Sequence, residues 1–153
     1  MNRPLYEVMR PTDFDDLMQP LQIINSLRRM AMTGHLVNML FYGDPGTGKT
    51  SVAHIMKRSL GDNWIEINGS LANGVDLIRK LQAAAFSYGI GDGPKVIFID
   101  ESEYLTTSAQ AGLRAVIEKS HKTTRWLLAA NDISRFHHAL KSRCLPVCFD
   151  VFD

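Results

Sequence analysis

One glycine-rich run sets narrow limits on the fold of this chain: Gly43-Asp44-Pro45-Gly46-Thr47-Gly48-Lys49-Thr50. It fits the pattern G-x-x-x-x-G-K-[ST], and it stands between an apolar run of strand length and a helical pattern. The glycines let successive backbone N–H groups converge on phosphate oxygens at a helix N-terminus, where the helix dipole favours negative charge. The pattern predicts a nucleotide site in which Lys49 reaches the outer phosphates and the Thr50 hydroxyl ligates magnesium.

Short apolar runs alternate with amphipathic helical patterns along the rest of the chain. Such alternation is typical of a parallel sheet covered by helices on both faces, so the sequence predicts an α/β fold with a five-stranded parallel sheet sandwiched by helices. The predicted strands are residues 39–42, 64–67, 96–99, 126–130 and 147–149. The predicted helices are residues 19–32, 49–60, 75–88, 108–120 and a shorter piece at 135–142.

Composition narrows the class of protein. With 153 residues, 45% hydrophobic and 22% charged, the chain fits one domain with a single core. A net charge of +1 predicts no partner by itself, so any contact with nucleic acid must come from a local patch. Cys144 and Cys148 lack a second Cys/His pair at metal-ligand spacing, which predicts reduced thiols in the cytosol. Apolar stretches of only a few residues and an N-terminus without an apolar signal region predict a cytoplasmic protein without a membrane partner.

Polar residues follow two further predicted strands. Asp100 and Glu101 come directly after residues 96–99; Asp100 is predicted to hold the magnesium hydration shell, and Glu101 to polarise a water for in-line attack on the terminal phosphoryl group. Taken without the glycine-rich loop, the pair is better explained as a solvated strand end or a helix cap. Asn131 follows residues 126–130, where it could hydrogen-bond the terminal phosphate or the attacking water, or could simply turn the chain.

Together these residues resemble the AAA+ ATPases, and within them the small, motor-type subunits of sliding-clamp loaders. The resemblance runs from Arg10-Pro11 to Cys144, and its most specific part is the triplet Ser142-Arg143-Cys144. The other carriers are Phe14-Asp15-Asp16-Leu17, the phosphate loop, Glu66-Ile67-Asn68-Gly69-Ser70, Asp100-Glu101, Ser108-Ala109-Gln110 through Leu113-Arg114, and Asn131.

The resemblance implies roles for further residues. Arg143 is similar in position to an arginine finger that reaches the ATP of a neighbouring subunit, and a planar guanidinium suits charge spread over phosphoryl oxygens. Arg79 matches a DNA-contacting position, although an exposed arginine more often belongs to an ordinary solvated helix face. Arg10 joins the ATP-binding set, whose other members are Pro45, Gly46, Thr47, Gly48, Lys49, Thr50 and Ser51.

The resemblance also implies an assembly. Members of this family act as oligomers, pentamers in the loader itself, that place a sliding clamp on primer-template DNA with ATP and Mg²⁺. They continue beyond the nucleotide-binding domain into a helical lid and a collar, so we expect residues 1–153 to be the RecA-like nucleotide-binding domain without lid or collar. A fragment and a short natural relative both remain open. The sequence Asn68-Gly69-Ser70 resembles that of the family members found in tailed bacteriophages more than that of the cellular members.

At two positions the sequence departs from the cellular members of the family. Ser102 stands where Ala is usual, and Arg114-Ala115 replaces paired arginines.

Two other functions stay open. A helicase loader, or another replication ATPase of this class, would share the nucleotide residues and differ in its partner. A nucleotide-sensing assembly module would bind ATP and hydrolyse little; intact Asp100, Glu101 and Arg143 argue against it for a full assembly, but not for this chain in isolation.

Overall fold

The computed structural model describes residues 21–71, 74–87 and 95–149, and within them five parallel strands form one sheet. The order across the sheet is β2-β3-β4-β1-β5, and every neighbouring pair is parallel. The predicted α/β architecture is therefore confirmed. The strands are β1 (Met39–Tyr42), β2 (Trp64–Asn68), β3 (Lys95–Asp100), β4 (Thr124–Ala130) and β5 (Leu145–Cys148).

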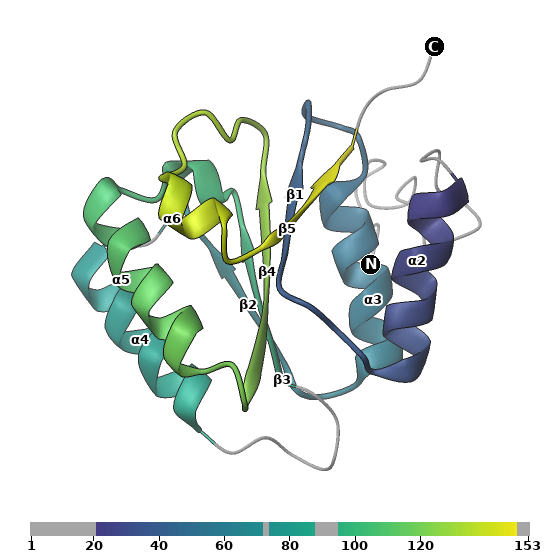
Figure 1. Ribbon diagram of the computed structural model, residues 1–153, viewed down its shortest axis with the longest axis horizontal. Helices are drawn as coiled ribbons and strands as arrows, with labels where there is room; N and C mark the ends of the chain where they lie inside the picture. The colour runs from purple at the N-terminus through teal and green to yellow at the C-terminus, as the bar shows by residue number, and fades with distance from the viewer. Residues whose placement is uncertain (1–20, 72–73, 88–94, 150–153) are drawn as a thin grey trace, which may run out of the picture.

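Helices cover both faces of the sheet (Figure 1). One face is covered by α2 (Leu21–Thr33) and α3 (Lys49–Leu60), and the other by α4 (Gly74–Phe86), α5 (Thr107–Lys119) and the short α6 (His138–Lys141). A single 3₁₀ turn, η2 (Ser102–Tyr104), follows β3 among the described residues. No described helix is both long and apolar enough to cross a membrane.

The central strands are apolar on both sides because both sides face helices. In β3, Ile97 and Ile99 pack in the core under α4 and α5, whereas Val96 and Phe98 pack in the core under α2 and α3. Successive side chains of a strand point to opposite faces, so a continuous apolar run fills both cores at once. This alternation explains why the sequence of β3 shows no polar face.

The structure moves some predicted boundaries. Residues 49–60 are correct for α3, but β5 begins at Leu145, two residues before the predicted 147–149, because Leu145 pairs with Met39 of β1. Pro146 is tolerated there because β5 is an edge strand. The prediction of residues 135–142 for α6 was too long, since His137 already caps the helix by accepting a hydrogen bond from the Ala139 N–H. Positions 19, 20 and 88 of the predicted helices lie outside the described residues.

Neither cysteine forms a disulfide, and Cys144 is buried in the core. Burial raises the pKa of the Cys144 thiol to about 12, so this thiol stays protonated at neutral pH. The side chain therefore contributes packing and carries no charge.

Three side chains close the C-terminal end of α4, and Lys95 is the buried cation among them. Its Nζ donates hydrogen bonds to the carbonyls of Ala84, at 2.8 Å, and Ser87. The hydroxyls of Thr123 and Thr124 donate to the Ala85 carbonyl at 2.8 and 2.9 Å. Burial lowers the pKa of Lys95, yet its charge lies at the negative end of the helix dipole.

We expect Lys95→Met to lower the free energy of unfolding by about 1–3 kcal/mol, because it keeps the apolar stem but leaves buried carbonyls without a donor. Urea unfolding followed by far-UV circular dichroism measures the change. Lys122→Met, at an exposed lysine in the turn after α5, is the control and should stay near the parent. Equal stability of the two variants would contradict a structural role for the Lys95 ammonium.

Candidate nucleotide-binding site

Three neighbouring strands bring the predicted site residues to one edge of the sheet. Strands β3, β4 and β1 lie side by side, and their carboxyl ends lead to Asp100 and Glu101, to Asn131, and to the glycine-rich loop. Tyr42, the last residue of β1, pairs with Ala130, the last residue of β4. The loop and Asn131 therefore leave the sheet at the same level.

The loop itself is shaped by its glycines. Gly43, Gly46 and Gly48 all have positive φ, at 144°, 79° and 98°, and Gly48 is the N-cap of α3. Side-chain-bearing residues rarely adopt this part of backbone space, so the glycines allow the chain to wrap round the N-terminus of α3. The free N–H groups of a helix N-terminus and its dipole make this a place for an anion.

Lys49 holds its ammonium inside the loop. Its Nζ donates hydrogen bonds to the carbonyls of Gly43 and Asp44, at 2.7 and 2.8 Å, and to the Thr47 hydroxyl at 3.2 Å. Burial lowers the pKa of Lys49, and nearby carboxylates, with Glu103 the strongest, oppose that shift. A cation is therefore fixed by backbone carbonyls at the point where the loop would receive phosphate.

Thr50 and Asp100, fifty residues apart in sequence, meet beside this cation. The Thr50 hydroxyl donates to Asp100 Oδ2 at 3.0 Å, and the Glu101 N–H donates to Asp100 Oδ1 at 2.8 Å. A hydroxyl beside a carboxylate fits Mg²⁺, which takes oxygen ligands and completes its shell with water and substrate phosphates. No group of three or more His, Cys, Asp or Glu side chains suited to a metal occurs in the described part of the chain.

Glu101 has a strained backbone conformation. Its φ of 50° and ψ of 44° are left-handed, and it is the single non-glycine residue with positive φ among the residues described. Gly69, at the end of β2, lies so close that a Cβ there would be 2.7 Å from the Glu101 carbonyl oxygen. Strain of this kind costs about 1–3 kcal/mol, persists where the surroundings enforce it, and is concentrated at functional sites.

Glu103 is a site residue that the sequence analysis missed. Its Oε2 accepts a hydrogen bond from the Asn131 backbone N–H at 3.1 Å, so it connects η2 to the end of β4. It also exerts the strongest of the carboxylate effects that raise the Lys49 pKa. The sequence feature that could have indicated Glu103 is its position two residues after Glu101. A short turn after a strand keeps the residues that follow it near the carboxyl edge of the sheet.

Two other predicted positions have clear structural roles. Ser102 is fully buried, and its hydroxyl donates to the Ile99 carbonyl at 2.7 Å, so the departure from Ala leaves no unpaired polar group. Gln110 is buried in α5; its Nε2 donates to the Arg135 carbonyl at 3.1 Å, and its Oε1 accepts from the His137 N–H at 2.7 Å. Gln110 therefore ties α5 to the segment that follows β4.

Arg143 lies apart from the phosphate loop. It comes two residues before Leu145, which pairs with Met39 at the start of β1, whereas the loop begins after Tyr42 at the end of β1. At about 3.3 Å per residue, β1 separates these two levels by roughly 10 Å. The guanidinium of Arg143 is paired instead with Glu118 of α5, with Nε donating to Oε1 at 2.8 Å.

Of the remaining predicted residues, Pro45 and Ser51 belong to the phosphate loop and the start of α3, whereas Arg79 lies on a different helix. Arg79 is exposed on α4, Ser51 lies in the first turn of α3, and Pro45 is exposed in the loop. Arg10 lies outside the described residues.

Comparison with known proteins identifies relatives of this arrangement. The model of the ATPase family associated with various cellular activities (AAA) matches residues 39–149. The chain is 38% identical over 145 residues to the replication factor C small subunit of Archaeoglobus fulgidus, covering 90% of this chain and 46% of that protein. It is 37% identical over 150 residues to the probable replication factor C subunit 5 of Dictyostelium discoideum, covering 92% and 43%. The chain thus spans a little under half the length of these relatives.

Solved structures share the fold at lower identity. The Thermotoga maritima RuvB Holliday junction branch migration motor has a TM-score of 0.68 at 24% identity, with 93% of this chain and 48% of that chain covered. A DNA polymerase III gamma subunit-related protein from the same organism has a TM-score of 0.69 at 16% identity, with 84% and 46% covered. These two likenesses support the fold, while the family match and the 37–38% identities establish kinship. This chain belongs to the AAA family of ATPases.

Proposed function

We propose that this chain is an ATP-binding and ATP-hydrolysing motor subunit of a sliding-clamp loader in DNA replication. The observation that carries the proposal is the meeting of Lys49, Thr50 and Asp100 at one sheet edge. The similarity to replication factor C small subunits favours a clamp loader over other ATPases with the same loop.

The residues divide the chemistry among them. The loop from Pro45 to Ser51 binds the ATP phosphates, with Lys49 supplying the cation. Mg²⁺, held by Thr50 and Asp100, supplies charge neutralisation on the phosphate oxygens when it is bound. Glu101 orients a water and accepts its proton. Asn131 hydrogen-bonds the terminal phosphoryl group or that water.

The assembly supplies the rest of the site. Within an oligomer of loader subunits, a pentamer by family resemblance, Arg143 faces the ATP of a neighbour and Arg10 contributes to its own ATP site. Arg79 contacts primer-template DNA, and the sliding clamp is the cargo. Residues 1–153 act as the nucleotide-binding domain, in the cytoplasm. The tailed-bacteriophage type stays a prediction.

Glu101→Gln should bind MgATP about as well as the parent, and it should hydrolyse ATP about 100-fold more slowly. The carboxylate acts on the attacking water, so its loss affects the transition state more than the bound nucleotide. The measurement is steady-state turnover and ATP affinity of the assembled complex. Glu66→Gln, at an exposed glutamate of β2, is the matched control. Turnover equal to that of the parent would remove Glu101 from the catalytic role.

The same assembly tests the clamp-loader assignment separately. We expect clamp and primer-template DNA to stimulate its ATPase and ATP to drive clamp onto DNA. An assembly that hydrolyses ATP without any response to clamp or DNA would leave the nucleotide site intact and refute the loader function.

A further inference from the structure

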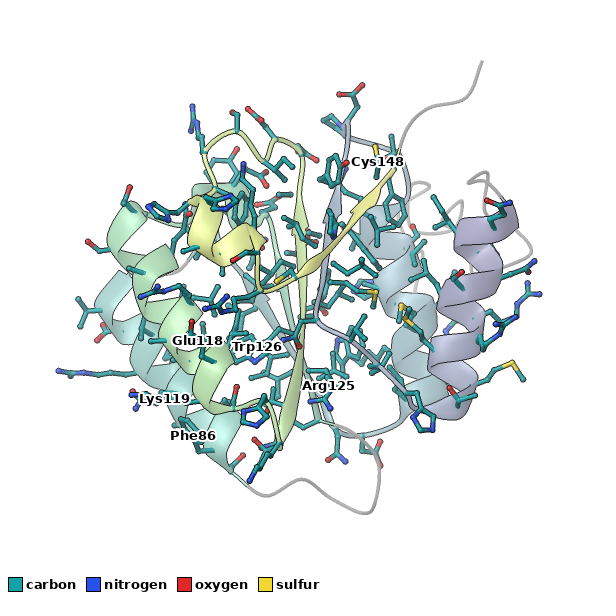
Figure 2. The ribbon with its side chains drawn as sticks, in the orientation of Figure 1. Phe86, Glu118, Lys119, Arg125, Trp126 and Cys148 are labelled. Carbon is teal, nitrogen blue, oxygen red and sulfur yellow. The ribbon has the colours of Figure 1, made fainter. Side chains whose placement is uncertain are left out.

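Arg143 and Glu118 form an ion pair between elements that are distant in sequence. Arg143 lies in the turn from α6 to β5, and Glu118 lies near the end of α5, where Figure 2 labels it. The Arg143 Nε donates to Glu118 Oε1 at 2.8 Å, and Nη2 donates to the same oxygen. The hydrogen bond from Arg143 holds the pKa of Glu118 below its ordinary value, so the pair stays charged at neutral pH.

Both residues stand on backbone that the core fixes in place. Cys144, the residue after Arg143, is buried, as is Leu140, three residues before it; α5 buries Val116 and Ile117 just before Glu118. The side chains themselves remain accessible, with 43% of Arg143 and 38% of Glu118 exposed. The Arg143–Glu118 ion pair is therefore partly exposed to solvent, while the backbone at both residues is held by packing in the core.

The geometry of the pair leaves part of the guanidinium available. An arginine side chain carries five N–H donors, and Glu118 engages Nε–H and one N–H of Nη2. Nη1 lies 3.5 Å from the Ser142 hydroxyl, at the outer limit of a hydrogen bond. The N–H groups of Nη1 and the second N–H of Nη2 can therefore still donate to phosphoryl oxygens. Nε and the first N–H of Nη2 stay bonded to Glu118.

We propose that Glu118 is a positioning residue for Arg143, which fixes the long side chain in the orientation that presents its far donors to the ATP of a neighbouring subunit. This inference rests on the proposed function, in which Arg143 acts across a subunit boundary. A free arginine would sample many rotamers, and anchoring one edge removes that disorder before the transition state is reached. The opposite arrangement, a latch that withholds Arg143, predicts the opposite kinetic result.

The test compares kcat and KM for ATP in the assembled complex of this chain with its partner subunits. Glu118→Gln should lower kcat about tenfold and change KM less than about twofold, because it misplaces a transition-state contact and leaves the ATP-binding loop intact. Glu118→Asp, which keeps the carboxylate, should recover part of the loss. The control is Glu66→Gln, since Glu66 is also a glutamate in a surface pair, 2.7 Å from His54 and 37% exposed. It should match the parent.

A double-mutant cycle separates positioning from a structural effect. In an Arg143→Ala background, Glu118→Gln should cause no further loss of kcat, because there is no guanidinium left to orient. A full further loss there, an unchanged kcat for Glu118→Gln in the parent, or a raised kcat would each overturn the proposal. If Arg143→Ala itself leaves kcat unchanged, the proposed role of Arg143 as an arginine finger is refuted, and so is the positioning role of Glu118. Normal stimulation by clamp and DNA together with an inert Glu118→Gln would refute this inference and leave the proposed function standing.

Discussion

Replacing Lys49 by alanine should leave the sheet folded and weaken MgATP binding at least about 100-fold, with loss of hydrolysis. The Lys49 ammonium is the cation that the loop holds at its centre, bonded to the carbonyls of Gly43 and Asp44. In the complex with ATP the same donors would turn to phosphate oxygens, where charge-assisted hydrogen bonds are stronger than those to carbonyls. Without them the loop keeps its helix dipole but loses its full positive charge.

Thermal unfolding with and without MgATP measures this loss, because a ligand that binds the folded state raises the transition temperature. Lys49→Met, which removes the charge and keeps the apolar stem, separates loss of charge from loss of volume. Lys57→Ala, at an exposed lysine of the same helix, should behave as the parent does. If Lys49→Ala showed the parent's shift with MgATP, the phosphate site would be assigned to the wrong residues.

Local pattern predicted the elements whose environment is simple. Helix α3 was correct at both ends because the phosphate loop sets its start and Gly61, with φ of 79°, ends it. Strands β3 and β4 were found because helices on both faces make nearly every position apolar. Strand β5 was misplaced because its bounds depend on pairing with β1, and Leu145 and Pro146 carry no local strand signal.

The same distinction applies to the site. Lys49, Thr50 and Asp100 were predictable because each belongs to a motif, and the parallel sheet brings the carboxyl ends of their strands to one edge. Glu103 and Glu118 were not predicted because their partners, the Asn131 N–H and Arg143, lie 28 and 25 residues away. Nothing in the local sequence distinguishes such a glutamate from one on a solvated face.

The position of Arg143 yields the second large expected effect. Arg143 lies near the level where β1 begins, and the loop of its own chain lies beyond the level where β1 ends. The guanidinium is paired with Glu118 and not with the loop of its own chain, so we expect the isolated chain to hydrolyse ATP slowly. In the proposed assembly, Arg143→Ala should lower turnover about 1000-fold at the neighbouring site that it faces, the effect typical of losing an arginine finger.

Mixing experiments identify which site loses activity. Arg143→Ala subunits should bind MgATP as the parent does, and should remain active at their own site when a neighbour supplies an intact arginine. Combining them with Lys49→Ala subunits, which have an intact Arg143 but no working loop, should restore hydrolysis wherever an intact arginine faces an intact loop. Neither variant should hydrolyse ATP when assembled by itself. If Arg143→Ala silenced just the subunit that carries it, complementation would not occur. The trans geometry would then be wrong. Arg143 would instead act on the phosphate loop of its own chain, across the separation of roughly 10 Å along β1.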